Sequence, residues 1–216
     1  MSMHPYIKNY GLFIFSVFIL GLVIALVTEA QLGTTAITSA PYVLSLFTPL
    51  SFGMFTMIFN ILYVLIEKLI MRSEFKKIQY LQFLVGPILG WAIDFWSQFV
   101  VYFARPFYMI RLLMVVIGCF IIACSVILQL KANVINNPAE GVVKAIATKA
   151  NISFGTVKIG FDVSLVCIAA LTSLVVFKTI HGIREGTLIS AVITGMFIKW
   201  LQRMLRRRDV IVENKV

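Results

Sequence analysis

Ser51-Phe52-Gly53 recurs later in the chain as Ser153-Phe154-Gly155, and each copy comes directly before a long apolar run. Both copies belong to the same larger order of segments, namely a span, a short helix and two further spans. We therefore interpret the chain as two related transmembrane units, residues 1–104 and 105–216, the second ending in a basic tail. Because each unit has an odd number of spans, the second enters the membrane upside down, so we predict inverted repeats with a site at their interface.

The composition is that of an integral membrane protein. Of 216 residues, 60% are apolar and 13% are charged, whereas soluble domains have about 25% charged residues. The apolar runs are continuous and lack the polar alternation of barrel strands, so we predict an all-α, polytopic helical membrane protein. Six runs have the length of a transmembrane helix: 11–28, 50–67, 79–104, 112–130, 155–177 and 186–202.

Two further segments, 34–49 and 138–150, have a helical pattern but are too short or too polar for comfortable spans. If both crossed the membrane, the basic loop at 68–77 would lie opposite the basic tail, against the positive-inside tendency. We therefore predict six spans, with both termini in the cytoplasm, and two short helices that dip into the membrane and return. The alternative for each short helix is an amphipathic position in the interface.

The short helices have recognisable starts. Asn137 suits the N-cap of the second, Pro138 its first helical position, and Glu140 can cap back; Thr34 and Thr35 supply a hydroxyl cap for the first. If these helices begin inside the membrane, their positive ends offer sites for anions or polar solutes. Asn137 and Glu140 are therefore candidate binding residues.

The fifth span carries Lys158 and Asp162 four residues apart, on one helix face where they can pair. Asp162 would lie on the order of 13 Å into the span, too deep for its short side chain to reach water. A buried ionisable group costs roughly 2.5 kcal/mol or more, which favours a functional site over a pair that only neutralises itself. The matching positions of the first unit, Thr56 and Asn60, are candidates for neutral hydrogen bonds.

Asp94 in the third span is the other acidic candidate. It shares this span with Gly86 and Gly90, whose spacing favours a close helix crossing. Its carboxylate lines a cavity in one interpretation and lies at the outer interface beside Trp96 and Tyr102 in the other.

Several classes of function have no support in the sequence. The net charge of +10 comes from loops and the tail, so we expect contact with anionic lipid head groups and no nucleic-acid partner. We expect no cofactor and no metal, because the cysteines have no paired spacing or nearby histidine. No catalytic motif argues for an enzyme. The basic residues of the tail are Arg203, Arg206, Arg207 and Arg208. The cysteines, all within predicted spans, are Cys119, Cys124 and Cys167.

The chain resembles the YczE/YyaS/YitT group of small bacterial membrane proteins over most of its length. The resemblance is carried by Leu32-Gly33-Thr34, by Pro138-Ala139-Glu140-Gly141, and most clearly by the block from Ser153 to Leu165. It implies a bacterial inner membrane location and marks the Lys158 and Asp162 region as a defining element, but supplies no substrate. Where members of the group often read Ser-Pro-Trp-Asp, this chain has Thr35-Ala36-Ile37-Thr38, so no role of that tryptophan or acid transfers.

The function that we expect is a small secondary transporter or channel-like permease for a small polar or anionic solute. Lys158 would attract the solute, Asp162 would hold that lysine or take up a coupling proton, and Asn60 and Thr56 would add hydrogen bonds from the other half. The alternative is a non-transporting accessory or regulatory protein that binds a partner protein or lipid. An intramembrane enzyme would need a second catalytic group facing Asp162 or Asp94.

Overall fold

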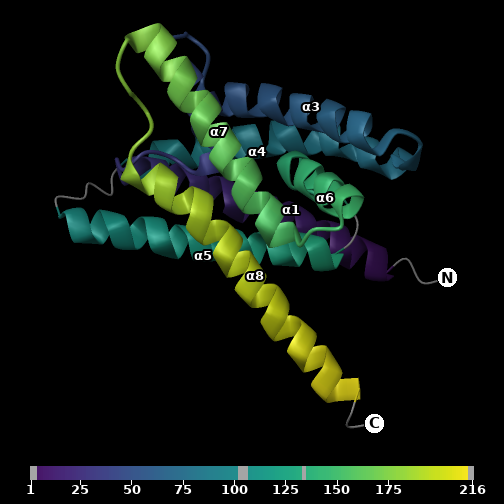
Figure 1. Cartoon of the computed structure of the whole chain (residues 1–216). Coiled ribbons are helices and arrows are strands. Elements are labelled where there is room, and N and C mark those ends of the chain that lie inside the picture. The colour runs from purple at the N-terminus through teal and green to yellow at the C-terminus, as the bar shows by residue number, and fades with distance from the viewer. Residues whose placement is uncertain (1–3, 102–106, 133–134, 214–216) are drawn as a thin grey trace.

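The computed structural model describes residues 4–101, 107–132 and 135–213, and within these ranges the chain is helical without strands, which confirms the predicted all-α fold. Loops join the long and short α-helices (Figure 1), and three 3-10 turns lie among them in the described residues. In chain order the elements are α1 (His4–Glu29), η1 (Ala36–Thr38), α2 (Ser39–Ser45), α3 (Phe52–Met71), η2 (Arg72–Glu74), η3 (Lys77–Leu81), α4 (Gln82–Val100), α5 (Tyr108–Ala132), α6 (Pro138–Ala150), α7 (Phe154–Phe177) and α8 (Glu185–Glu213).

Within the described ranges, six helices are long and apolar enough to cross a membrane, namely α1, α3, α4, α5, α7 and α8. They are the six spans that the sequence predicts, so the protein is a multi-pass membrane protein. Large apolar side chains such as Leu69, Leu171 and Val175 remain exposed, which is the expected surface of a bundle whose solvent is lipid. The predicted boundary between the two units, 104/105, lies outside the described residues.

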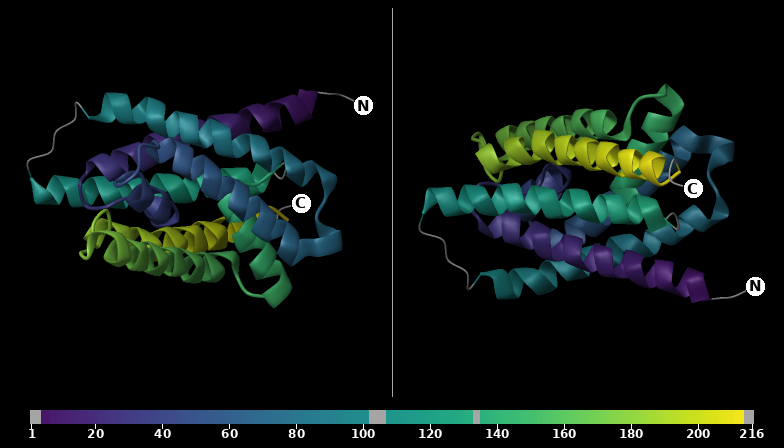
Figure 2. Two further views of the ribbon diagram at one scale, coloured as in Figure 1. Left: turned by 90° about the horizontal axis from the view of Figure 1, so that it is seen from above. Right: turned by 90° about the horizontal axis from the view of Figure 1, so that it is seen from below.

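The direction of the helices explains why the number of crossings is six. Figure 2 shows that α1 begins and α8 ends at the same end of the bundle, and that the turn after α3 also lies there. α1 and α3 run in opposite directions with α2 between them, and α5 and α7 run in opposite directions with α6 between them. α2 and α6 therefore each enter and leave on one side.

α6 lies inside the bundle rather than on its surface. Its residues 138–143 are all buried, whereas residues 148–150 at its other end are exposed. An amphipathic helix in the interface would expose one face along its whole length. The burial pattern instead fits the re-entrant alternative for this segment.

The helix contacts of the first four helices are repeated by the last four. α1 packs on α4 as α5 packs on α8, α3 packs on α4 as α7 packs on α8, and α1 contacts α5. Each short helix contacts both α3 and α7. The starts of α2 and α6 are thereby brought to the centre of the molecule.

Glycines permit the closest of these approaches. A Cβ placed on Gly53 of α3 would lie 2.1 Å from the carbonyl oxygen of Gly90 on α4, and a Cβ on Gly155 of α7 would lie 2.9 Å from that of Gly195 on α8. Neither distance can be tolerated by a real side chain without movement of the backbone. The close crossing that the sequence predicts for the third span is therefore present at Gly90, and an equivalent one joins α7 to α8.

Candidate functional site

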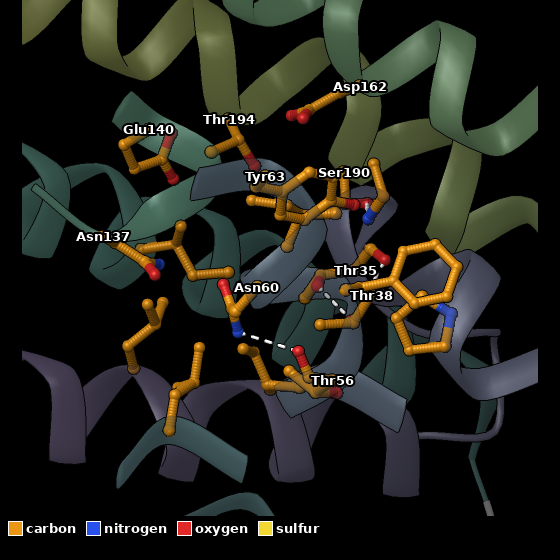
Figure 3. A pocket seen from close by; sticks show the side chains of 18 of the residues that line it. Thr35, Thr38, Thr56, Asn60, Tyr63, Asn137, Glu140, Asp162, Ser190 and Thr194 are labelled. Carbon is orange, nitrogen blue, oxygen red and sulfur yellow. Dashed lines mark hydrogen bonds between the residues drawn. The ribbon is translucent and has the colours of Figure 1, made fainter. Parts of the chain in front are cut away.

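A small cavity lies at the centre of the bundle, where the starts of both short helices meet α3, α7 and α8 (Figure 3). Most of its lining surface is apolar, and polar side chains occupy the remainder. Its empty space is about 510 Å³, of which about 20 Å³ can hold the centre of a water-sized sphere. A single water needs roughly 10–15 Å³ by this measure, so the cavity has room for one water molecule or small ion. Its polar lining consists of Thr35, Thr38, Thr56, Asn60, Tyr63, Asn137, Glu140, Lys158, Asp162, Ser190 and Thr194.

Three charged side chains meet at one wall of the cavity. Lys158 Nζ lies 2.7 Å from Asp162 Oδ1 and 3.6 Å from Glu140 Oε2, and all three side chains are at most 3% exposed. Charges buried this deeply are tolerated only when they are paired. The i,i+4 pair predicted from the sequence is therefore present, but it is joined by an acid from α6 and does not neutralise itself alone.

The neutral pair predicted from the other half lies across the cavity. Asn60 Nδ2 donates to the carbonyl oxygen of Thr56 at 2.9 Å, and the Thr56 hydroxyl donates to the carbonyl of Phe52, also at 2.9 Å. Figure 3 shows Thr56 and Asn60 on the side opposite Asp162 and Glu140. Matching positions of the two apolar runs thus face each other across one cavity.

Asn137 begins α6, but the side-chain cap expected from the sequence is absent. No cap bond is made by its side chain, and within the described ranges Asn137 Oδ1 has no hydrogen-bond partner. Its backbone N–H donates to Gln129 Oε1 at 3.3 Å, while the side chain borders the cavity. The expected return cap by Glu140 is replaced by its contact with Lys158.

The first short helix is also capped differently from the prediction. Thr35 occupies the N-cap of η1 without a side-chain cap bond. Instead, the backbone N–H groups of Thr34 and Ala36 donate to the hydroxyls of Thr187 and Ser190 on α8, at 3.1 and 2.9 Å. The cap therefore comes from the other half of the chain, a tertiary contact that local sequence does not reveal.

Asp94 is the one predicted site residue that does not line the cavity. Its Oδ2 accepts a hydrogen bond from the Ser51 hydroxyl at 2.6 Å, and its Oδ1 accepts one from the Gly53 N–H at 2.8 Å. A carboxylate at the start of a helix satisfies free N–H groups and interacts favourably with the helix dipole. Asp94 therefore fastens α4 to the start of α3.

The cavity retains unused hydrogen-bonding capacity. Within the described part of the chain, Tyr63 OH, Asn137 Oδ1 and Glu140 Oε2 are buried without a hydrogen-bond partner, although all three residues line the cavity. Buried polar atoms are normally bonded to protein or water. These groups can therefore bind water or the polar groups of a solute. The same described residues contain no group of three or more His, Cys, Asp or Glu side chains that could hold a metal ion.

Sequence reasoning missed several polar residues of the lining. Tyr63 follows Asn60 by three residues, and Ser190 and Thr194 continue a polar stripe that starts at Thr187. Residues at spacings of three and four share one helix face. Such stripes on α3 and α8 were the signal that would have found them.

A family model described as "Family of unknown function (DUF6198)" matches residues 7–203, a range that contains every residue of the cavity lining. Neither a curated protein nor a solved structure matches the chain.

Proposed function

This chain belongs to the family of unknown function DUF6198, and we propose that it is a small secondary transporter or channel-like permease for a small polar or anionic solute. One observation carries the proposal. A buried cavity with a mostly apolar lining lies between helices of both halves, with Lys158 and two carboxylates on one wall and neutral hydrogen-bonding groups on the other. A protein that only binds a partner or lipid has no need of buried ionisable groups around a cavity.

The repeated helix contacts support an architecture of two inverted repeats, α1 to α4 and α5 to α8. Each proposed repeat contributes three crossings and one short helix that starts beside the cavity. In transporters built this way, the solute site lies near the midplane and one repeat moves against the other around it. Asn60 and Asp162, which occupy matching positions of the two proposed repeats, lie on opposite sides of the cavity, and this placement supports the pseudo-symmetry (Figure 3).

The charges of the site suggest how a solute and a proton would bind together. Lys158 is already shared between two carboxylates, and the start of α6 adds roughly half a positive charge. An anionic solute that approaches Lys158 therefore meets excess negative charge unless Asp162 or Glu140 takes up a proton. Proton uptake would release the lysine for the solute, which links the two binding events.

In the proposed transport cycle, a cavity of this size corresponds to a closed conformation. Space for one water-sized molecule admits no metabolite, so the solute enters only when the helices around the site separate. The short helices are suited to this movement, because each contacts both α3 and α7, which lie in different proposed repeats. Opening on one side would move these contacts while the opposite side stays closed.

The proposed location is a bacterial inner membrane with both termini in the cytoplasm, as the resemblance to the YczE/YyaS/YitT group suggests. The basic loop at 68–77 lies at the same end of the bundle as the start of α1 and the end of α8 (Figure 2), and positive charge favours the cytoplasmic side. Anionic lipids are the proposed partners of the basic tail. The side chains of Arg206, Arg207 and Arg208 lie outside the described part of the structure.

A ligand screen tests the proposal. The purified protein, Asp162→Asn and Ser164→Ala are heated in the presence of small anions, cations and metabolites, because a ligand that binds only the folded state must stabilise it. Ser164 is a matched control, since it is exposed on the same helix and bonds only to the carbonyl of Phe161. A compound that stabilises the protein and Ser164→Ala but not Asp162→Asn supports a solute site. Stabilisation of none of them favours the accessory-protein alternative and a search for a co-purifying partner.

A further inference from the structure

A second buried acid lies outside the central cavity. Glu67 on α3 is 1% exposed, and its Oε1 accepts a hydrogen bond from Gln79 Nε2 at 2.7 Å. Within the described ranges its Oε2 has no hydrogen-bond partner, and neither amide atom of the fully buried Gln82 has one. The central site uses none of these groups.

Glu67 is hydrogen-bonded to a residue of a second cavity. This second cavity, here called the vestibule, has about 790 Å³ of empty space and is lined by residues that include Glu74, Gln79, Asn136 and Lys144. Asn136 borders the vestibule, whereas the next residue, Asn137, borders the central cavity. The start of α6 is therefore a thin wall between the two.

The contacts of Glu67 connect it to both sides of this wall. Gln79, its hydrogen-bond partner, lines the vestibule, and Tyr63, one helical turn before Glu67, lines the central cavity. A Cβ placed on Gly141 would lie 2.2 Å from Glu67 Oε2. Gly141 directly follows Glu140, the carboxylate that contacts Lys158 in the central cavity. The free carboxylate oxygen therefore points at the first turn of α6.

We propose that Glu67 is a separate proton-binding site that passes protons between the vestibule and Glu140. A hydronium ion in the vestibule gives a proton to the Glu67 carboxylate and becomes water. The resulting acid then gives its proton to a bridging water, which passes one of its own protons to the Glu140 carboxylate. Only O–H bonds form and break, so no further reactant is needed. The destination of the proton rests on the proposed transport function, whereas the site itself does not.

The surroundings fit a proton better than a metal ion. Gln79 and Gln82 are neutral, and Lys144 of α6 lies close enough to Glu67 to interact with its charge. The side-chain amides of Gln79 and Gln82 lie beside the Glu67 carboxylate, whereas a hard cation takes about six oxygen ligands. With Lys144 charged, binding of one proton to Glu67 changes the combined charge of Glu67 and Lys144 from zero to +1.

Infrared difference spectroscopy tests the site without a known solute. Spectra of the purified full-length protein at low and high pH contain the C=O stretch of every carboxyl group that gains a proton. Glu67→Gln should remove one buried component of this band. The control is Glu74→Gln, because Glu74 lies just after α3 and its side chain is exposed; this variant should leave the buried components unchanged. A buried band that is identical in Glu67→Gln and the unmodified protein overturns the proposal.

Two measurements separate this proposal from the proposed function and from simple misfolding. The variants Asp162→Asn and Glu140→Gln identify the bands of these two carboxyl groups. After transfer to D₂O at low pH, both carboxyl groups should exchange hydrogen for deuterium more slowly in Glu67→Gln than in the unmodified protein, by roughly ten-fold or more. An unchanged rate overturns the relay even if a transported solute is found. Gln79→Leu keeps the carboxylate and removes its hydrogen bond, so it should shift the Glu67 band; an unshifted band means that the carboxylate does not titrate there.

Discussion

Lys158 Nζ lies within 3.6 Å of carboxylate oxygens from two different helices, Asp162 on its own helix α7 and Glu140 on the re-entrant helix α6. The lysine therefore fastens α6 to α7 at the wall of the cavity. Its two partners also differ in distance, because Asp162 Oδ1 is a hydrogen-bond partner at 2.7 Å and Glu140 Oε2 is not.

This arrangement predicts unequal costs for breaking the group. Lys158→Met leaves two carboxylates facing each other, whereas Asp162→Asn leaves Lys158 with Glu140 as partner. Removal of one partner of a buried ion pair costs about 3–5 kcal/mol, and we expect Lys158→Met to reach this range and Asp162→Asn to cost less. Thermal unfolding in detergent measures the difference. Equal or reversed losses would show that Glu140 does not share the lysine.

The glycines of α7 predict opposite effects of the same substitution. A Cβ on Gly155 would lie 2.4 Å from Lys199 Cγ and 2.9 Å from the carbonyl of Gly195, while a Cβ on Gly160 meets nothing within 4 Å. Gly155→Ala should lose about 1–3 kcal/mol through overpacking, and Gly160→Ala should be neutral or gain up to about 1 kcal/mol from helix propensity. Unfolding temperatures of the two variants test this. A tolerated Gly155→Ala would contradict the close approach of α7 and α8.

Asp94 provides a test that separates structure from solute binding. Asp94→Ala removes the acceptor for the Ser51 hydroxyl and the Gly53 N–H, so it should lower stability by about 1–3 kcal/mol. Because Asp94 does not line the cavity, a ligand that stabilises the unmodified protein should raise the unfolding temperature of Asp94→Ala by the same increment. Loss of that increment would place Asp94 in the binding site.

The re-entrant path of the short helices predicts a labelling pattern. After replacement of the native cysteines, single cysteines at the exposed positions Pro49 and Thr179 should react with a membrane-impermeant reagent from one side of the membrane. Cysteines at the exposed positions Ser73 and Thr148 should react only from the other side. If residue 49 reacts from the same side as residue 73, the first short segment crosses the membrane.

The sequence was sufficient to predict the helical fold and most of the candidate site. Continuous apolar runs predict spans because membrane thickness fixes their length. The comparison of the two runs that follow Ser-Phe-Gly brought together Lys158, Asp162, Thr56 and Asn60, and the structure places all four at one cavity. An ionisable residue deep in a span is costly, which is why such residues stand out.

The remaining features depend on tertiary contacts. Lipid is as apolar as a helix interface, so the apolar residues of α3 and α8 do not indicate which face of each helix is internal. Tyr63, Glu67 and Thr194, which lie on internal faces, were missed for that reason. The expected side-chain caps at Asn137 and Thr35 were wrong. At the first short helix, hydroxyls of the distant helix α8 accept the N–H groups instead, and the Asn137 N–H donates to Gln129 of the preceding helix. Asp94 was left between two interpretations, and it proved to be the cap of a neighbouring helix.

Flux through Asp162→Asn tests the central claim most directly. The protein, this variant and Ser164→Ala are reconstituted in liposomes, and uptake is measured for a compound that stabilises the unmodified protein. We predict uptake by the unmodified protein and Ser164→Ala, and none by folded Asp162→Asn. Uptake by Asp162→Asn at the unmodified rate would contradict the account, because the buried carboxylate would then have no part in transport.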